Sequence, residues 1–126
     1  MKNRRCSLER STTETSIKID INIDGKGEGD INTGIPFFDH MLQQIARHGF
    51  IDLNIEAKGD IEIDFHHTVE DVGIVLGQSI AEALGDKKGI KRYATFFIPM
   101  DESLSMASVD ISGRPYLYYE ADFTGE

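Results

Sequence analysis

The sequence has few of the features that mark secreted and membrane-spanning proteins. Its single cysteine, Cys6, cannot form a disulfide within the chain, so nothing indicates an oxidising compartment and ordinary packing on a strand is expected for it. No stretch approaches the ~20 apolar residues that a membrane span requires. No apolar segment follows the basic residues near the N-terminus, which argues against a secretory signal. These absences predict a soluble, unprocessed, cytoplasmic protein without a membrane partner.

Basic residues are also scarce, because 13 Lys and Arg stand against 22 Asp and Glu. The formal net charge is -9 and the sequence pI is near 4.8. Nucleic acid is therefore excluded as a partner, since neutralising its phosphates needs clustered Lys and Arg. Small cationic ligands or metal ions suit this charge better. With 126 residues, of which 40% are hydrophobic, the chain can form one ordinary domain with a core.

Histidine is concentrated in one part of the chain, and all four histidines lie between positions 40 and 67. The run from His66 to Asp71 combines two imidazoles with two carboxylates. On a helix, Glu70 shares a face with His66 at i, i+4 and with His67 at i, i+3. Imidazole and carboxylate together suit manganese, iron or zinc, so the run predicts part of a metal site. The alternative is a pair of surface histidines with carboxylates that complement a helix N-terminus.

A second polar group surrounds His40, which follows an acid and precedes Met41. His40, Gln44 and His48 recur at i, i+4 and i+8, so they line one face of a predicted helix. A solvated helix face would explain the spacing but not the enrichment in histidine. The two groups together favour metal binding.

The remaining pattern of the first 90 residues predicts two β-strands, a helix, further strands and a second helix. Strict alternation marks the first strand, and Pro36 and Gly49 mark the ends of the first helix. Thr68 and Asp71 are interpreted as a capping box at the start of the second helix. The predicted elements are a strand at 17–23, an antiparallel return at 29–33, a helix at 36–48, a strand at 51–57, an alternating stretch at 61–65 and a helix at 68–84, with Val72, Val75, Leu76, Ile80 and Leu84 as its buried stripe.

The last part of the chain repeats the opening. Strands are predicted at 93–98, 104–111 and 116–123. Glu14 precedes Gly25 by 11 residues, and Glu102 precedes Gly113 by 11, which indicates an internal repeat with an offset of 88. The predicted fold class is α+β, with tandem β-β-α-β-α repeats. Residues 1–90 would form a complete first repeat, and 91–126 would supply only the strands of a second, truncated repeat. Such a chain is expected to be unstable alone or to be assembled with something.

Five motifs, in order, resemble the imidazoleglycerol-phosphate dehydratase family over nearly the whole chain. The motifs are Arg10-Ser-Thr-Thr-Glu14-Thr, Thr33-Gly-Ile-Pro-Phe-Phe-Asp-His-Met-Leu42, His66-His-Thr-Val-Glu-Asp71, Pro99-Met-Asp-Glu102 and Ser112-Gly-Arg-Pro115. The resemblance implies a lyase of histidine biosynthesis that converts imidazole glycerol phosphate to imidazole acetol phosphate. It implies two manganese ions (Mn²⁺) per site and tandem repeats like the second domain of ribosomal protein S5. It also implies large homo-oligomers with sites at subunit interfaces.

The resemblance also assigns roles to residues at the matching positions. His40, His66, His67 and Glu70 would be metal ligands, with further ligands from the second repeat of the same or a neighbouring chain. Asp71 would orient a ligand histidine through its other ring nitrogen. Glu14 would be the acid/base that moves the proton.

Other residues would contact the substrate. Arg92 and Arg114 would clamp its phosphate, because the guanidinium fork suits a phosphate dianion. For Arg114, a solvent-exposed turn residue is the alternative. Gln44 and His48 are weaker candidates for touching the substrate. The pair Asp101 and Glu102 is open to a surface turn or to support of the site.

The truncation leaves the function of the chain open. The resemblance places a second double-histidine motif and a phosphate-contacting lysine beyond Glu126, so a complete metal site is not expected from these residues alone. One alternative is a non-catalytic metal-binding assembly module that keeps His66, His67 and Glu70. Another is a metal-dependent hydrolase, which would release the phosphate that a dehydratase leaves on its product.

Overall fold

The structure is a computed structural model that describes residues 3–123, and these form two units. The chain divides after Asp86. The elements of the first unit are β1 (Arg5–Ser11), β2 (Thr15–Asn22), β3 (Ile31–Asn32), α1 (Pro36–Gly49), β4 (Asp52–Gly59) and α2 (His66–Leu84); those of the second are β5 (Tyr93–Met100) and β6 (Ser103–Asp110). The predicted α+β class is confirmed. No helix in the described part of the chain is long and apolar enough to cross a membrane.

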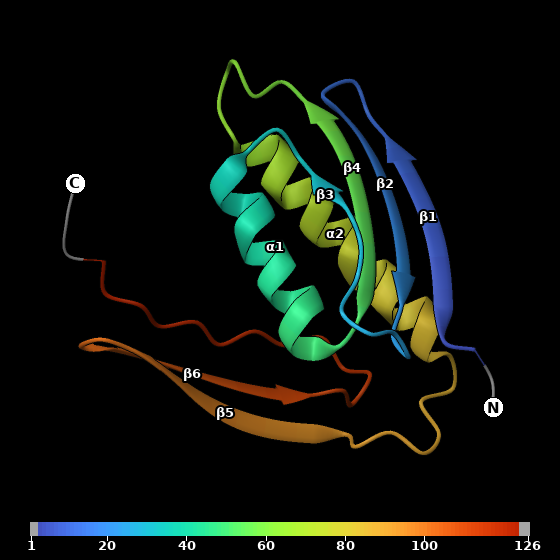
Figure 1. Ribbon diagram of the computed structural model, residues 1–126, viewed down its shortest axis with the longest axis vertical. Coiled ribbons are helices and arrows are strands. Elements are labelled where there is room, and N and C mark those ends of the chain that lie inside the picture. Colours follow the sequence, from blue (N-terminus) through green and yellow to red (C-terminus); the bar gives the residue numbers. More distant parts are fainter. Residues whose placement is uncertain (1–2, 124–126) are drawn as a thin grey trace. The chain divides into compact units, whose positions relative to one another are not determined.

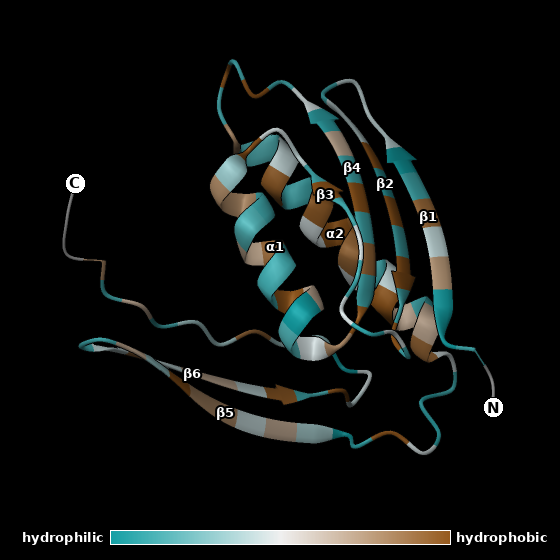
Figure 2. Ribbon diagram, in the orientation of Figure 1, coloured by the Kyte–Doolittle hydropathy of each residue, from teal (hydrophilic) through white to brown (hydrophobic). Residues whose placement is uncertain are grey.

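The first unit is a four-stranded sheet with the strand order β1-β2-β4-β3 and both helices on one face (Figure 1). The alternation along β2 and β4 places apolar side chains on that face, and Figure 2 shows it as brown residues between teal ones. The helices bury these side chains, because α2 contacts β1, β2 and β4. The core consists of Ile17, Ile19, Ile21, Leu42, Ala46, Leu53, Ile55, Ala57, Val72, Val75 and Ala83.

Both helices begin at the same end of this sheet. β3 and β4 are parallel, and each is followed by a helix that runs back along the sheet. The turn between β1 and β2 also lies at this end, because Thr15 pairs with Gly59, the last residue of β4. We call this the ligand end of the sheet, since it collects most of the candidate site residues.

The helices and hairpin strands agree with the sequence prediction to within about two residues, which is the usual uncertainty of element ends. α1 ends at Gly49, and Phe50 adopts the left-handed conformation that follows many helices. On α2, Val72 and Val75 are buried, and Leu76 and Ile80 pack partly buried against the core. Cys6 packs on a strand as expected, but the bounds of that strand, β1, were not predicted, because Cys6, Leu8 and Arg10 on its inward face make a weak apolar alternation.

The predicted antiparallel return at 29–33 is wrong. Only Ile31 and Asn32 form a strand, and that strand is parallel to β4. The preceding loop is attached to β4, since Asp52 Oδ1 accepts the N–H groups of Lys26 (2.7 Å) and Glu28 (3.2 Å). The loop bound by Asp52 therefore leads into β3 on the edge of β4 that does not pair with β2.

Two further predicted strands are absent. Residues 61–65 form a turn, closed by the Ile63 N–H bond to the Asp60 carbonyl at 2.9 Å, and lead directly into α2. Ile63 and Phe65, which the alternation placed on a strand, are 73% and 53% exposed. The segment 116–123 forms no strand, because no neighbouring strand supplies hydrogen bonds to it.

The predicted capping box of Thr68 and Asp71 is also wrong. Both residues lie buried inside α2, which already begins at His66. The His66 N–H instead donates to Asp64 Oδ1 at 2.7 Å. One N–H group of the first turn of the helix is therefore satisfied from the preceding turn, and Asp71 is available for a different contact.

The two hairpins have the same register at the predicted offset of 88. Arg5 pairs with Asn22 at one end of the β1–β2 ladder, and Tyr93 pairs with Asp110 at the corresponding place in the β5–β6 ladder. The ends of both hairpins are closed alike, by the N–H of Ile23 on the Arg4 carbonyl and the N–H of Ile111 on the Arg92 carbonyl, each at 2.9 Å. The second hairpin therefore repeats the first at the level of individual hydrogen bonds.

Gly59 sets how closely the ligand end of the sheet approaches α2. A Cβ at Gly59 would lie 2.1 Å from Thr68 Oγ1, and Thr68 is fully buried. Gly59→Ala should therefore lower the free energy of unfolding by about 1–3 kcal/mol. Gly77→Ala on α2 is the matched control, since no neighbouring described element lies within 4 Å of its Cβ position. The control should stabilise the protein by about 0.4–1 kcal/mol, because alanine favours a helix. Urea unfolding monitored by circular dichroism measures both, and equal effects of the two variants would contradict this role of Gly59.

Candidate metal centre

His67 is held by a carboxylate at the ligand end of the sheet. Its Nδ1 lies 2.9 Å from Oδ2 of Asp60, the residue that directly follows β4. This hydrogen bond raises the pKa of His67, and the charges of Glu14 and Asp64 act in the same direction. A histidine whose Nδ1 is bound to a carboxylate presents Nε2 outward, as metal-ligating histidines usually do.

His66 and Glu70 form a second pair on the first turn of α2. His66 Nε2 lies 3.1 Å from Glu70 Oε2, and both side chains are more than half exposed. The rings of His66 and His67 are 5.4 Å apart and nearly perpendicular. Two imidazoles and one carboxylate therefore sit together on one helical turn, where solvent and ligands can reach them.

Asp71 fixes α2 to the β1–β2 hairpin. Its carboxylate is nearly buried, lies 2.5 Å from Arg10 Nη1 and accepts a hydrogen bond from the Thr15 hydroxyl. These contacts lower the pKa of Asp71, and the hydrogen bond from Thr15 is the largest cause. The histidine contact expected of Asp71 is made by Asp60 instead. Asp71 positions the helix that carries the histidines relative to the hairpin.

Glu14 lies in the turn between β1 and β2 at the same end. The Thr12 hydroxyl accepts the N–H groups of Glu14 and Thr15, at 3.1 and 3.0 Å, and shapes this turn. Hydrogen bonds from Thr13 and Thr12 lower the pKa of the Glu14 carboxyl, and the nearby charge of His67 also favours the ionised form. Glu14 is thus an exposed carboxylate, ionised at neutral pH, within electrostatic reach of His67.

His40, Gln44 and His48 follow one another along α1, as predicted. Gln44 Nε2 donates to the His40 carbonyl at 3.3 Å, and His48 Nε2 shares a hydrogen bond of 3.2 Å with Gln44 Oε1. The preceding Asp39 accepts the backbone N–H of Thr33 at 2.8 Å, which anchors the start of α1. His40 is therefore placed in the first half of α1, near the ligand end, with its side chain exposed.

The donor set fits a borderline divalent metal, although the described residues do not enclose one. Within residues 3–123, no three His, Cys, Asp or Glu side chains come close enough together to hold a metal ion. Asp60 Oδ1 is buried without a hydrogen-bond partner there, which leaves a carboxylate oxygen available beside His67. Imidazole and carboxylate are the ligands that manganese, iron and zinc share. His40, His66, His67 and Glu70 could hold such an ion together with ligands from elsewhere.

The two arginines predicted to bind phosphate belong to the second unit. Arg92 donates to both carboxylate oxygens of Asp110, at 2.7 and 3.1 Å, and this bidentate bond lowers the pKa of Asp110. Arg92 therefore keeps only its other N–H donors for a ligand. Arg114 lies in the bend that follows β6, exposed, with its backbone N–H on Ser112 Oγ at 3.2 Å.

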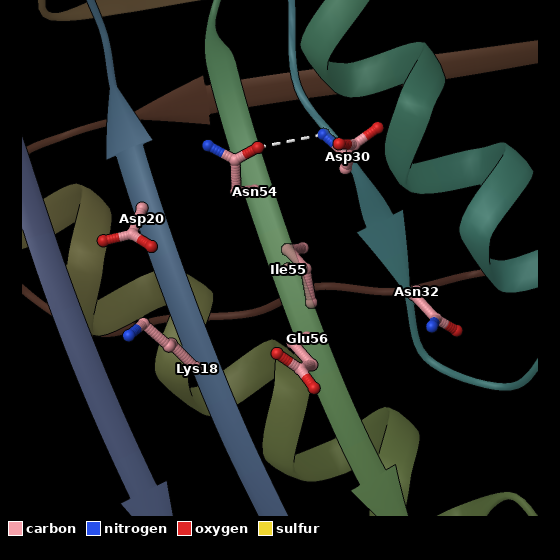
Figure 3. Close-up of a pocket in the computed structure, with 7 residues that line it drawn as sticks. All are labelled: Lys18, Asp20, Asp30, Asn32, Asn54, Ile55 and Glu56. Carbon is pink, nitrogen blue, oxygen red and sulfur yellow. Dashed lines mark hydrogen bonds between the residues drawn. The ribbon is translucent and has the colours of Figure 1, made fainter.

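A shallow hollow lies elsewhere, over the strands on the sheet face opposite the helices. Figure 3 shows the polar side chains of β2, β3 and β4 that line it, with the Asp30 N–H bonded to Asn54 Oδ1 at 2.9 Å. None of the sequence-predicted site residues lines this hollow. It is part of the solvated face of the sheet.

Asp60, Arg10 and Thr15 were not among the predicted site residues. The pair Gly59-Asp60 is an ordinary turn signal, and a carboxylate seven residues before a histidine has no recognisable spacing. Asp60 could have been found by searching for a carboxylate that binds the second ring nitrogen of a ligand histidine. For Arg10, an arginine on the inward side of a strand indicates a buried acid opposite it.

Comparison with known proteins identifies the family of this chain. Residues 33–126 match the family model described as imidazoleglycerol-phosphate dehydratase. The chain is 67% identical over 118 residues to the imidazoleglycerol-phosphate dehydratase of Alkaliphilus metalliredigens, covering 94% of this chain and 60% of that protein. It is 61% identical over 124 residues to that of Clostridium botulinum, covering 98% and 63%.

Solved structures agree with the sequence matches. The crystal structure of imidazoleglycerol-phosphate dehydratase from Staphylococcus aureus matches with a TM-score of 0.83 at 43% identity, over 97% of this chain and 66% of that one. These matches define an α+β enzyme fold. The chain belongs to the imidazoleglycerol-phosphate dehydratase family, and it spans about three fifths of the length of the curated relatives that it matches.

The contact between Asp60 and His67 predicts a measurable effect on metal affinity. Asp60→Asn removes the charge that orients the imidazole, so a divalent metal held by His67 should bind about 10–100-fold more weakly. Glu62→Gln is the control, because it removes the same charge from the exposed part of the same turn. Isothermal titration with Mn²⁺ measures both variants. Equal affinities for the two would show that Asp60 does not support a ligand.

Proposed function

We propose that this chain carries the first-repeat part of the active site of a manganese-dependent hydro-lyase. The reaction converts imidazole glycerol phosphate to imidazole acetol phosphate in histidine biosynthesis. The observation that supports this best is the convergence of Glu14, His66 and His67 at one end of one sheet, in a chain of the dehydratase family. The oligomeric assembly and the cytoplasmic location implied by the family belong to the same proposal.

The reaction needs a base that is ionised before the substrate arrives. Elimination of water removes a proton from the carbon bearing the middle hydroxyl and hydroxide from the carbon attached to the imidazole ring. The resulting enol becomes the ketone by taking up a proton at the ring-attached carbon. Glu14 suits both transfers, because its lowered pKa keeps it ionised and its exposed turn leaves it accessible.

The histidines would bind and orient rather than transfer protons. His67, held through Nδ1 by Asp60, and His66, beside Glu70, would contribute to a metal centre together with His40. Bound Mn²⁺ would supply positive charge that stabilises the electron-rich imidazole of the substrate. The phosphate would be held by Arg114 and by the N–H donors of Arg92 that Asp110 leaves unused.

A metal-binding assembly module is the second candidate function. It is favoured by one observation, that no three ligand groups meet within residues 3–123. On this reading, metal bound at His66, His67 and Glu70 would join polypeptides without turnover. Metal stoichiometry and elimination activity separate it from the enzyme.

The reaction class can be tested with a chimera in which this chain is followed by the part of the Clostridium botulinum relative that lies beyond the match. With Mn²⁺ and imidazole glycerol phosphate, we expect imidazole acetol phosphate by mass spectrometry and no inorganic phosphate. Release of phosphate would instead indicate a hydrolase. Bound manganese without product would support the assembly module.

The role of Glu14 is tested in the same chimera. Glu14→Gln should lower kcat by about 10²–10⁴-fold, the usual contribution of a general acid or base, while manganese content stays unchanged. Glu9→Gln is the matched control, since Glu9 is exposed on the same hairpin and forms an ion pair with Lys18 at 3.0 Å. Loss of manganese in Glu14→Gln would make Glu14 a ligand, and retained turnover would reject its role in proton transfer.

A further inference from the structure

The turn that carries Glu14 is held by side-chain hydroxyl groups as well as by its backbone. It joins β1 to β2 at the ligand end of the sheet, the end at which α2 begins (Figure 1). The Thr12 N–H closes the turn by donating to the Thr15 carbonyl at 2.8 Å. The Thr12 hydroxyl then accepts the N–H groups of Glu14 and Thr15, at 3.1 and 3.0 Å. The backbone of Glu14 is therefore fixed through a side chain of its own turn.

The Thr15 hydroxyl attaches this turn to α2. Thr15 is only 5% exposed, and its hydroxyl donates to the Asp71 carboxylate. Because the hydroxyl proton is used there, the oxygen can accept a hydrogen bond from the Thr12 hydroxyl, 3.3 Å away. A chain of hydrogen bonds thus runs from α2 through two hydroxyls to the backbone of Glu14. His67 lies one helical turn before Asp71, so this chain ends on the helix that carries the histidines.

The second hairpin has a glutamate at the same place but closes its turn differently. At the offset of 88, Glu102 corresponds to Glu14. Met100 pairs directly with Ser103, which leaves a two-residue turn, and Asp101 in that turn adopts a left-handed conformation with a φ of 50°. Two-residue hairpin turns usually need such a conformation. A glutamate at this position therefore does not by itself require hydroxyl groups around it.

The hydroxyl arrangement is specific to the first hairpin. Thr12 corresponds to Met100, which has no hydroxyl to accept the N–H groups of the turn, and Arg10 corresponds to Ile98. The second hairpin thus lacks both the Thr12 hydroxyl and the arginine that pairs with Asp71. Since a hairpin of this register closes without them, these groups indicate a demand on where the first turn lies.

The position of Glu14 depends on the backbone of its turn, because the side chain is exposed and no packing restrains it. Proton transfer requires the base to lie within hydrogen-bond reach of the proton, at about 2.6–3.2 Å. A misplacement of about 1 Å can lower a rate by about 10²-fold. A small shift of this turn would therefore reduce proton transfer strongly while leaving the fold intact.

We propose that Thr15 is a positioning residue for proton transfer, whose buried hydroxyl holds the turn of residues 12–15 against α2 and so keeps Glu14 in place relative to the histidines. The inference rests on the proposed function, in which Glu14 moves the proton. Thr15 itself touches neither substrate nor metal in this role. Its methyl group has a separate contact, since Cγ2 lies 3.3 Å from the Cβ position of Gly59. The hydroxyl and the methyl group can therefore be tested separately.

Kinetics of the chimera separate the two groups of Thr15. Thr15→Val removes the hydroxyl and keeps the shape, and should lower kcat by about 10–100-fold with KM and manganese content unchanged. Thr15→Ser keeps the hydroxyl and should retain most of kcat. Ser79→Ala is the control, because it removes another buried hydroxyl, bonded to the Val75 carbonyl at 2.8 Å, and should leave kcat unchanged. Equal losses of kcat in the two Thr15 variants, or a loss that lies in KM, would overturn the proposal.

Hydrogen exchange gives a second readout that requires no turnover. In the chimera without metal or substrate, Thr15→Val should speed exchange in peptides that span residues 12–15, measured by mass spectrometry, and leave the turn of the second hairpin unchanged. Thr12→Ala should act in the same direction, and because Thr12 is exposed this variant should still fold.

The two readouts distinguish failure of this inference from failure of the proposed function. Unchanged exchange in both variants would overturn the inference whether or not the chimera is active. Faster exchange with unchanged kcat would also overturn it, because the turn would then move without affecting proton transfer. A wild-type chimera that makes no product would reject the proposed function and with it the role in proton transfer, whereas the exchange rates would still show whether the hydroxyl holds the turn.

Discussion

The ion pair between the nearly buried Asp71 and the partly exposed Arg10 is the contact on which the arrangement of the site depends. It joins the second turn of α2 to the end of β1, and the Thr15 hydroxyl joins the same carboxylate to the start of β2. The turn that carries Glu14 lies between these two anchor points. The position of the acid/base candidate relative to the histidines is therefore set by one nearly buried carboxylate. Removing one partner of such a pair leaves an uncompensated charge, which costs more than the pair contributes.

Gly59 acts together with this ion pair. Because glycine has no Cβ, the end of β4 lies against Thr68, and the chain can turn at once into Asp60 and reach α2 within seven residues. The position of Asp60 opposite His67 is fixed by the end of β4 before it and by the turn into α2 after it. The first histidine motif is thus oriented by the ends of two strands that are neighbours in the sheet but far apart in sequence.

Much of the fold followed from periodicity, and the failures have physical causes. Strict alternation identified β2, and the positions of Pro36 and Gly49 marked the ends of α1, because these signals are local. The stretch 61–65 alternates like a strand but is too short to pair before α2 must begin. The parallel position of β3 depends on hydrogen bonds that Asp52 accepts from the N–H groups of Lys26 and Glu28, 26 and 24 residues earlier in the chain, which no local pattern contains.

The site residues also divide into those that a local sequence pattern reveals and those that only long-range contacts define. His40, His66, His67 and Glu70 were found because histidine and carboxylate at helical spacing form a local pattern. Asp60 and Arg10 were missed because their partners are defined only by the sheet, through the pairing of Thr15 with Gly59.

The common starting end of the two helices has an electrostatic consequence. Each helix N-terminus carries about half a positive elementary charge, and two of them pointing to one place add rather than cancel. A metal ion entering there meets this positive potential as well as its ligands. Acidic side chains at this end offset the positive potential and allow a cation to bind. They are Glu14, Asp39, Asp60, Asp64 and Glu70. The two helix ends add to about one positive charge, which these carboxylates outweigh, so before a metal binds the ligand end attracts a divalent cation more strongly than an anion.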